Sequence, residues 1–525
     1  MSESYDSVMY CESGVPGYPD RAMERGSESA QPTAEHLQHR ESRDRTLLPK
    51  PDLQTFRKRG AILAICSMSL FIVGLDNTIV NVALPSIGAH LHASVSGLQW
   101  TVDAYTLVLA SLLMLSGSTA DRLGRKRTFQ AGLIIFSTGS LLCSVAPSLS
   151  LLVAFRAFQA VGGSMLNPVA LSIITNTFTD RKERAQAIGV WGAVIGLSMG
   201  LGPVVGGALV SAAGWPSIFW VNVPIGVAAC VLTALFVPES KATRARRVDP
   251  VAQALLIVVL SSLTYGIIEG PAKGYTSLAI LAVFAVAGVS LCAFVAYERH
   301  RSEPLVDMRF FRSFPFSAAS VIAVVAFACL GGFLFLNTLY LQEVRHLGAF
   351  AAGVDTLPMA LMVVVLPPIS GAVVARRGTR IPLVVAGGFL AASGLLLTSL
   401  RASTPFSELF LAYALFGIGF GMVNAPITNT AISGMPNSQA GVAAAIASTG
   451  RQVGQVLGVA VLGTLATATI GSSGSSGTES LNLPGATHPG WWILVACGVT
   501  ISALGWASST TLARRSATAV AERFA

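Results

Sequence analysis

The chain has 525 residues, of which 52% are hydrophobic and only 12% are charged, with a net charge of +9 and a mean hydropathy of +0.64. Soluble domains carry about a quarter charged residues, so this balance indicates a polytopic helical membrane protein. The basic residues form short clusters between apolar runs, which is typical of membrane topology and excludes a nucleic-acid-binding surface.

The residues that build metal and catalytic sites are placed unfavourably for such sites. Six of the seven cysteines lie in apolar runs without a CxxC spacing, and the histidines lie in the first 57 residues or in loops. No GxxxxGK[ST] motif for binding a nucleotide occurs. We therefore expect no catalytic residues, no metal and no cofactor.

The first 57 residues are polar, rich in Ser, Glu and Arg, and lack apolar periodicity. This composition predicts a disordered cytoplasmic N-terminal tail. It also lacks the features of a cleaved signal peptide, so the first membrane span is expected to direct insertion.

Fourteen apolar runs of about 20 residues follow, each long enough to cross a hydrocarbon core of about 30 Å. Their predicted limits are 60–82, 97–119, 128–147, 149–173, 185–210, 217–237, 250–269, 276–297, 316–341, 351–375, 382–400, 406–432, 441–466 and 490–512.

Lysine and arginine distribute unequally between the two sides of these runs. Clusters at 57–59, 122–127, 181–184, 241–247, 299–312, 376–380 and 514–523 share one side, whereas the other side has only Lys273, Arg345 and Arg401. This asymmetry predicts that both termini are cytoplasmic. The loop 433–440 is an exception, since it is predicted to be cytoplasmic yet has no basic residue.

The sequence contains an internal repeat. Gly117 and Gly124 with Arg122 between them recur as Gly371 and Gly378 with Arg376, and the span containing Pro168 resembles that containing Pro426 at a nearly equal offset. Two homologous halves with a cavity between them are predicted. The expected organisation is a tail (1–57), a six-helix half (58–238), an inserted two-helix hairpin with cytoplasmic linkers (239–312), a second six-helix half (313–512) and a C-terminal cytoplasmic tail (513–525).

Four segments carry recognisable motifs: residues 75–85 in the first span, 117–127 after the second, 156–163 in the fourth and 196–207 in the fifth. In this order they resemble the major facilitator superfamily, in its fourteen-span drug:proton antiporter branch, over about residues 58–512. The resemblance implies an all-α membrane protein of the major facilitator fold, with 14 transmembrane helices in two pseudosymmetric six-helix halves plus an inserted helix hairpin.

The same resemblance implies a function. A monomer in the bacterial inner membrane would export hydrophobic or amphipathic small molecules in exchange for protons by alternating access. The Ala-, Gly- and Arg-rich composition is similar to that of actinobacterial antibiotic exporters. A transporter of an endogenous metabolite on the same fold and a transporter-like membrane sensor remain alternatives. The placement of His and Cys argues against a membrane-embedded enzyme.

Asp76 is an ionisable group inside the first span, where such groups usually face a bundle interior or a water-filled cavity. Burial favours the proton-bound form of a carboxylate, so Asp76 is a candidate for proton coupling. Arg156 lies at a comparable predicted depth, and the resemblance implies a part for it in proton transfer. The alternatives are a structural Asp76 and an Arg156 that is neutralised by one fixed partner.

The loop after the second span has the residues of a conformational latch: Gly117, Asp121, Arg122, Gly124 and Arg125. Its glycines permit a tight turn and its carboxylate can pair with an arginine. The simpler alternative is a loop that only marks topology. The repeat copy has Ala375 in place of the aspartate, so only the first copy offers a carboxylate.

The fifth span carries small residues on one face, at Gly192, Gly196 and Gly200, which predicts close approach of a neighbouring helix. The pattern continues through Gly202, Pro203, Gly206 and Gly207, which resembles an antiporter motif that seals a helix contact. Ordinary small-residue packing is the alternative. Four further polar residues are candidates for the substrate cavity: Arg451, Asp103, Tyr105 and Asn424.

Overall fold

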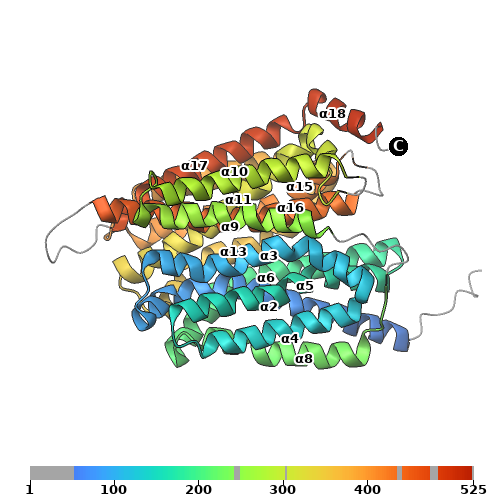
Figure 1. Cartoon of the computed structure of the whole chain (residues 1–525), viewed down its shortest axis with the longest axis horizontal. Coiled ribbons are helices and arrows are strands. Elements are labelled where there is room, and N and C mark those ends of the chain that lie inside the picture. Colours follow the sequence, from blue (N-terminus) through green and yellow to red (C-terminus); the bar gives the residue numbers. More distant parts are fainter. Residues whose placement is uncertain are drawn as a thin grey trace, which may run out of the picture. The chain divides into compact units, whose positions relative to one another are not determined.

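The apolar runs form helices in the computed structural model, which describes residues 53–241, 249–301, 304–433, 435, 440–472 and 483–522. The long helices (Figure 1) are α2 (Leu53–Leu91), α3 (Val95–Leu123), α4 (Arg125–Ser144), α5 (Leu149–Thr177), α6 (Arg181–Ala213), α8 (Asn222–Phe236), α9 (Pro250–Lys273), α10 (Leu278–Arg299), α11 (Phe314–Leu339), α13 (Leu357–Arg377), α14 (Arg380–Leu397), α15 (Phe406–Ile432), α16 (Ala440–Ser472) and α17 (Leu483–Ala507). Shorter segments are α7 (Ser217–Trp220), η1 (Met308–Arg312), η2 (Tyr340–Val344), α12 (Ala349–Asp355) and α18 (Thr511–Glu522).

Each predicted run coincides with one of these helices, although two runs are interrupted. Twelve helices in the described residues are long and apolar enough to span a membrane. Helices α4 and α16, which also correspond to predicted spans, are not among these twelve. The described chain therefore agrees with twelve to fourteen spans. The run at 351–375 breaks at Thr356 because Pro358 opens the next helix and cannot continue the preceding one. The run at 217–237 breaks at Val221.

The C-terminal end differs from the prediction. The last span ends at Ala507 rather than near residue 512, and the expected tail contains the helix α18. This helix buries Ala513, Ala517 and Val520, which lie on one face at helical spacing, against α11 and η1. Most of the predicted N-terminal tail (1–52), most of the 433–440 loop and residues 523–525 lie outside the described residues.

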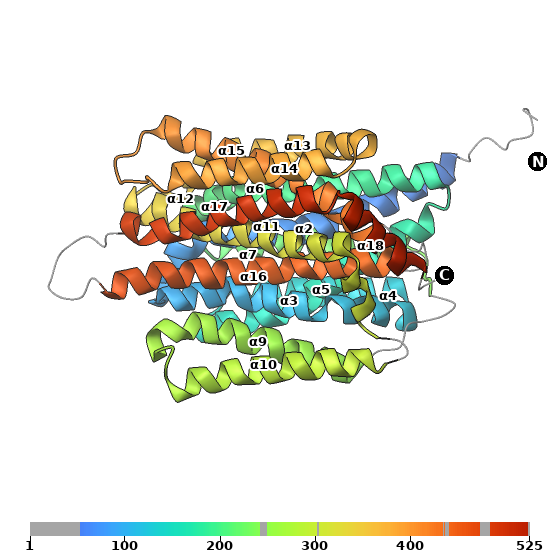
Figure 2. The ribbon, with the colours of Figure 1, turned by 90° about the horizontal axis from the view of Figure 1, so that it is seen from above.

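The packing repeats between α2–α8 and α11–α17. Helix α5 packs on α3 and α4 in the first set, as α15 packs on α13 and α14 in the second. The pairs α4–α8 (Figure 1) and α14–α17 (Figure 2) also correspond. Gly124 and Gly378, the paired glycines of the sequence repeat, both end a helix with positive φ, of 114° and 78°. These conformations favour glycine, which explains why both copies retain it.

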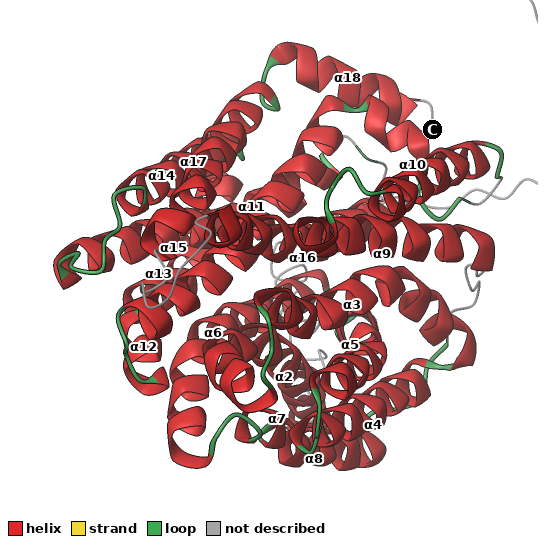
Figure 3. Cartoon of the chain, turned by 60° about the vertical axis from the view of Figure 1, so that its left-hand side comes forward, coloured by secondary structure: helices red, strands yellow, loops and turns green. Residues whose placement is uncertain are grey.

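Among the described contacts, two helix seams join the sets, one between α3 and α16 and the other between α6 and α12–α13 (Figure 3). A hydrogen bond from η2 to α2 joins them as well. We call the end of the bundle where α4, α6 and α14 begin with arginine the basic end, and the opposite end the far end. Gln99 Nε2 donates to the carbonyl oxygens of Val459 (3.1 Å) and Ala460 (2.9 Å), and Gln342 Nε2 donates to Val82 O (2.8 Å). These bonds all lie in the far half of the helices, so the sets are closed together there.

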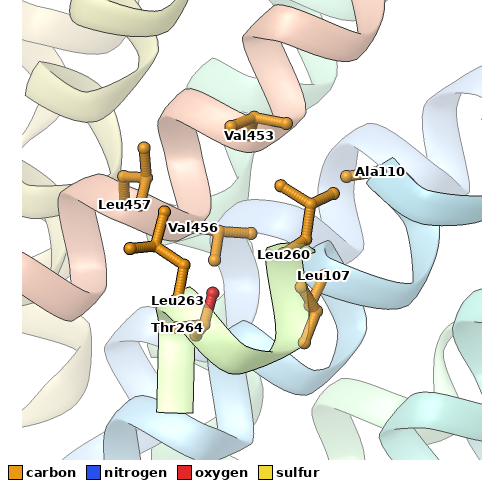
Figure 4. A pocket seen from close by; sticks show the side chains of 8 residues that line it. All are labelled: Leu107, Ala110, Leu260, Leu263, Thr264, Val453, Val456 and Leu457. Atoms are coloured by element: carbon orange, nitrogen blue, oxygen red, sulfur yellow. The ribbon is translucent and has the colours of Figure 1, made fainter. Parts of the chain in front are cut away.

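The hairpin α9–α10 lies beside the first seam, since α9 packs on both α3 and α16. Trp100 Nε1 donates to Glu269 Oε1 (3.0 Å), and Thr464 Oγ1 donates to Ile267 O (3.1 Å). Gln253 also donates to Ser111 O nearer the basic end. Between the three helices lies an apolar pocket (Figure 4), lined by Leu107, Ala110, Leu260, Leu263, Thr264, Val453, Val456 and Leu457.

Candidate functional site

The structure brings Asp76 of α2 and Arg156 of α5 into direct contact. Arg156 Nη1 donates to Asp76 Oδ2 over 2.6 Å. The side chain of Asp76 is 0% exposed and that of Arg156 is 1% exposed. Arg156 also donates through Nε to Thr101 O (3.2 Å) and through Nη1 to Gln159 Oε1 (2.8 Å). The two residues, which were predicted to lie at comparable depth, are thus in direct contact, and both are sealed from solvent rather than facing a cavity.

Two amides complete the hydrogen bonding of Asp76. Gln159 Nε2 and Asn222 Nδ2 donate to Oδ1 over 3.0 and 3.1 Å. Three donors therefore converge on this carboxyl group, one of them a guanidinium, and charge-assisted hydrogen bonds are stronger than neutral ones. Arg156 is the counter-ion of Asp76 in this conformation.

The pair is surrounded by groups that fix the guanidinium. The Arg156 Cζ lies 4.2 Å from the centroid of the Tyr105 ring and 5.7 Å from that of Phe219. Aromatic faces attract a desolvated cation. Arg156 is thus held by its ion pair with α2, a backbone carbonyl and a ring of α3, and a ring of α7.

Asn222 was not among the predicted site residues. It stands at the start of α8, which the break after α7 directs toward Asp76, and its Nδ2 also donates to Ser140 Oγ (3.1 Å) on α4. An asparagine inside an apolar run is costly unless bonded, and that signal was present in the sequence. Gln159, which the sequence showed only as part of a motif, is likewise a partner of Asp76.

In the predicted latch, Asp121 Oδ1 pairs with Arg125 Nη2 over 3.2 Å, one turn apart. The sequence reasoning missed Glu239, which follows α8. Its Oε1 accepts from Lys126 N (3.1 Å), its Oε2 lies 3.7 Å from Arg127 Nε, and a Cβ on Gly124 would meet it at 2.6 Å. Glu239 therefore caps α4 against the loop, a role that its position beyond the sixth span did not reveal.

The glycine face of α6 contacts the second set of helices. A Cβ on Gly196 would lie 3.1 Å from Val363 O and one on Gly200 the same distance from Ala360 O, while Gly207 packs on Ala349. Gly202 and Gly206 instead face α2, at Thr78 and Ile79, and Pro203 O packs against Gly353.

The prediction for Gly192 is wrong, because nothing lies within 4 Å of its Cβ position. Gly192 lies one turn nearer the basic end than Gly196.

The candidate cavity residues separate into two groups. Asp103 and Tyr105 are both 0% exposed because α3 presents them to packed neighbours, and their place in a substrate cavity stays a prediction. Arg451 and Asn424 are partly exposed, and Arg451 Nη2 donates to Thr428 Oγ1 over 3.1 Å.

Comparison with known proteins agrees with this architecture. The family model described as the Major Facilitator Superfamily matches residues 66–459. Among solved structures, a bacterial homolog of the human lysosomal transporter Spinster, in an inward-facing conformation, has a TM-score of 0.60 at 18% identity, covering 88% of this chain and 98% of that chain. A peptide transporter in complex with sulfate has a TM-score of 0.61 at 14% identity, covering 84% and 94%. These likenesses show the fold.

Relatives of similar length are much closer in sequence. Multidrug resistance protein Stp of Mycobacterium tuberculosis is 36% identical over 403 residues, covering 77% of this chain and 75% of that protein. The tetracenomycin C resistance and export protein of Streptomyces glaucescens is 36% identical over 425 residues (81% and 78%), and the methylenomycin A resistance protein of Streptomyces coelicolor is 34% identical over 409 residues (77% and 85%). The chain belongs to the Major Facilitator Superfamily and is a multi-pass membrane protein.

Proposed function

We propose that this protein is a proton-coupled antiporter that exports hydrophobic or amphipathic small molecules, antibiotics among them. The observation that carries the proposal is the fully buried Asp76–Arg156 pair, because a membrane-embedded carboxylate with a balancing arginine is a group that can exchange a proton. The names of the relatives, which refer to multidrug resistance and to antibiotic resistance and export, support the substrate class.

The basic end is proposed to face the cytoplasm, in accordance with the excess of lysine and arginine there. Closure of both seams at the far end then corresponds to an inward-facing conformation. The two helix sets would act as halves that rock about the seams, with the glycine face of α6 as one of the contacts that must separate.

In the proposed cycle, a substrate enters from the cytoplasmic side while Asp76 is ionised and bound to Arg156. After the halves rock outward, a proton from outside binds the Asp76 carboxylate and displaces Arg156, and the substrate leaves. The protonated protein returns inward, where Asp76 releases the proton to the cytoplasm and binds Arg156 again. The Asp121–Arg125 loop, held by Glu239, is proposed to stabilise one of these states at the cytoplasmic end.

The test uses everted membrane vesicles acidified by respiration. Addition of a transported drug should release protons through the wild type, and Asp76→Asn should abolish this release because the amide cannot bind a proton. Asp355→Asn is the matched control, since Asp355 is a partly exposed carboxylate at the end of α12. Normal drug-stimulated proton release by Asp76→Asn would contradict the proposal, and a resistance panel in an expressing host would select the drug.

A further inference from the structure

Asp103 on α3 is a buried acid that the Asp76–Arg156 pair does not explain. Its side chain is 0% exposed, and neither carboxylate oxygen accepts a hydrogen bond of normal geometry from a described residue. The neighbouring Thr106 hydroxyl donates to the backbone oxygens of Val102 (3.2 Å) and Asp103 (3.3 Å) instead. An ionised carboxylate in this position would be strongly unfavourable, since nothing replaces the water lost on burial. The arrangement fits the neutral acid.

Its position on α3 places it in the seam between the two helix sets. Asp103 is one turn after Gln99, which binds the carbonyl oxygens of Val459 and Ala460, and one turn before Leu107. Leu107 lines the apolar pocket with Val456 of α16 (Figure 4). Residues four apart share a helix face, so Asp103 lies on the face of α3 that closes against α16 at the far end.

The charged and titratable groups on the surrounding helices are engaged elsewhere. On α5, Arg156 binds Asp76 and Thr101 O. On α9, Glu269 accepts a hydrogen bond from Trp100, and on α16, Arg451 donates to Thr428. On α4, Cys143 donates to Gln159. Tyr105, on α3 itself, lies against Arg156. None of these groups has a recorded ion pair or hydrogen bond with the Asp103 carboxylate.

Gln99 provides a partner for a proton. Its Oε1 is buried without a donor, one turn from Asp103 on the same face. A proton on the Asp103 carboxyl group converts one of its oxygens from an acceptor into a donor. Loss of that proton leaves a negative charge without a counter-ion between packed helices. Closure of the seam is therefore linked to protonation of Asp103.

We propose that Asp103 is a second, gating proton site, which takes up a proton from the far side of the membrane as the α3–α16 seam closes and returns it to that side when the seam opens. It differs from Asp76 because its proton is not carried across the membrane. This inference rests on the proposed transport cycle for the opening of the seam.

The first test measures opening at the far end directly. Spectroscopic labels on Ala212→Cys and Ala402→Cys, which are exposed positions in the two helix sets, report the distance between the sets in the reconstituted full chain with its native cysteines replaced. In an Asp76→Asn background, where residue 76 can no longer bind a proton, raising the pH should lengthen this distance. The open-to-closed ratio should change about tenfold per pH unit over the titration of one proton.

Adding Asp103→Asn, which mimics the neutral acid, should keep the seam closed at every pH. Asp355→Asn in its place should leave the dependence intact. A pH-dependent distance that persists in Asp76→Asn/Asp103→Asn overturns the gating site, as does a distance in Asp76→Asn that does not respond to pH. The proposed function fails separately, if Asp76→Asn alone still couples drug movement to protons.

The second test detects the proton itself without a substrate. Infrared spectra of the reconstituted wild type at neutral pH should contain the C=O band of a buried carboxylic acid, which Asp103→Asn removes and Asp76→Asn retains. Asp103→Glu keeps an acid and should shift the band, which provides the assignment if the asparagine variant accumulates poorly. An unchanged band in Asp103→Asn, or in Asp103→Glu, overturns the assignment.

Discussion

Asn222 of α8 donates one amide to both Asp76 Oδ1 of α2 and Ser140 Oγ of α4, each over 3.1 Å. Ser140 in turn donates to Phe219 O, just before the break that begins α8. A single side chain thereby ties three helices at the buried carboxylate, and it does so in the span that supplies neither member of the ion pair.

Asn222→Leu should move the pH dependence of transport in the alkaline direction. The Asn222 amide donates to the Asp76 carboxylate, and loss of a hydrogen bond to a charged group costs about 1.5–3 kcal/mol. Initial rates of drug-driven proton release across a pH series give the shift. Ser140→Ala keeps the bond to Asp76 and should shift the profile less. Equal profiles for wild type and Asn222→Leu would disprove this role.

Gly207→Ala should destabilise the closed far end, because the added methyl group collides with the backbone at Ala349 and Phe350. Overpacking of this kind costs about 1–3 kcal/mol. Thermal unfolding in detergent should show a lower midpoint, and transport in vesicles should slow. Gly192→Ala on the same helix, with open space around it, is the control and should behave as the wild type. Equal loss in both variants would contradict the packing argument.

Glu239→Ala should loosen the start of α4, since it removes the acceptor of Lys126 N and the charge facing Arg127. Loss of a helix cap costs about 0.5–2 kcal/mol. The midpoint of thermal unfolding measures the effect. Glu183→Ala, which removes the exposed ion pair with Arg59 and no cap, should cost less. A Glu239→Ala protein as stable as wild type would show that the contact has no energetic importance.

Asp249 should make the α9 N-terminus sensitive to acid. Partial burial raises its pKa, but hydrogen bonds from Ala252 N, Arg301 and Tyr297 together outweigh this and hold the pKa below the usual 3.8. Because the folded-state pKa is depressed, the stabilisation is present above about pH 4 and disappears as the pH falls through the folded value. Thermal unfolding of wild type and Asp249→Asn should therefore differ at neutral pH and converge in acid. A difference that does not change with pH would contradict this sign.

The fold was largely predictable. The length of the apolar runs predicts the membrane-spanning helices, and the distribution of Lys and Arg among the loops predicts their orientation. Helix interruptions were not predicted: α12 ends shortly before Pro358, and the break at Val221 comes shortly before Pro224. The amphipathic spacing of Ala513, Ala517 and Val520 is visible in the sequence, but this segment was predicted only to be a cytoplasmic tail.

The site was predicted in part. Asp76 and Arg156 follow from the rarity of charge inside spans, but Asn222 depends on which way α8 faces, and no periodicity in one chain specifies that. The burial of Asp103 and Tyr105 likewise reflects the closed seam, which is a property of one conformation. Their roles and those of the latch residues remain predictions.

The α9–α10 hairpin makes the two sides of the transporter unequal. Helix α9 is hydrogen-bonded to both α3 and α16, whereas α6 meets α12 and α13 away from the hairpin (Figure 3). Separation of α3 from α16 must therefore break the bonds of α9 to one of them or carry α9 along, and the hairpin imposes no such constraint on the other seam. The twofold repeat of the sequence thus produces two seams with different surroundings.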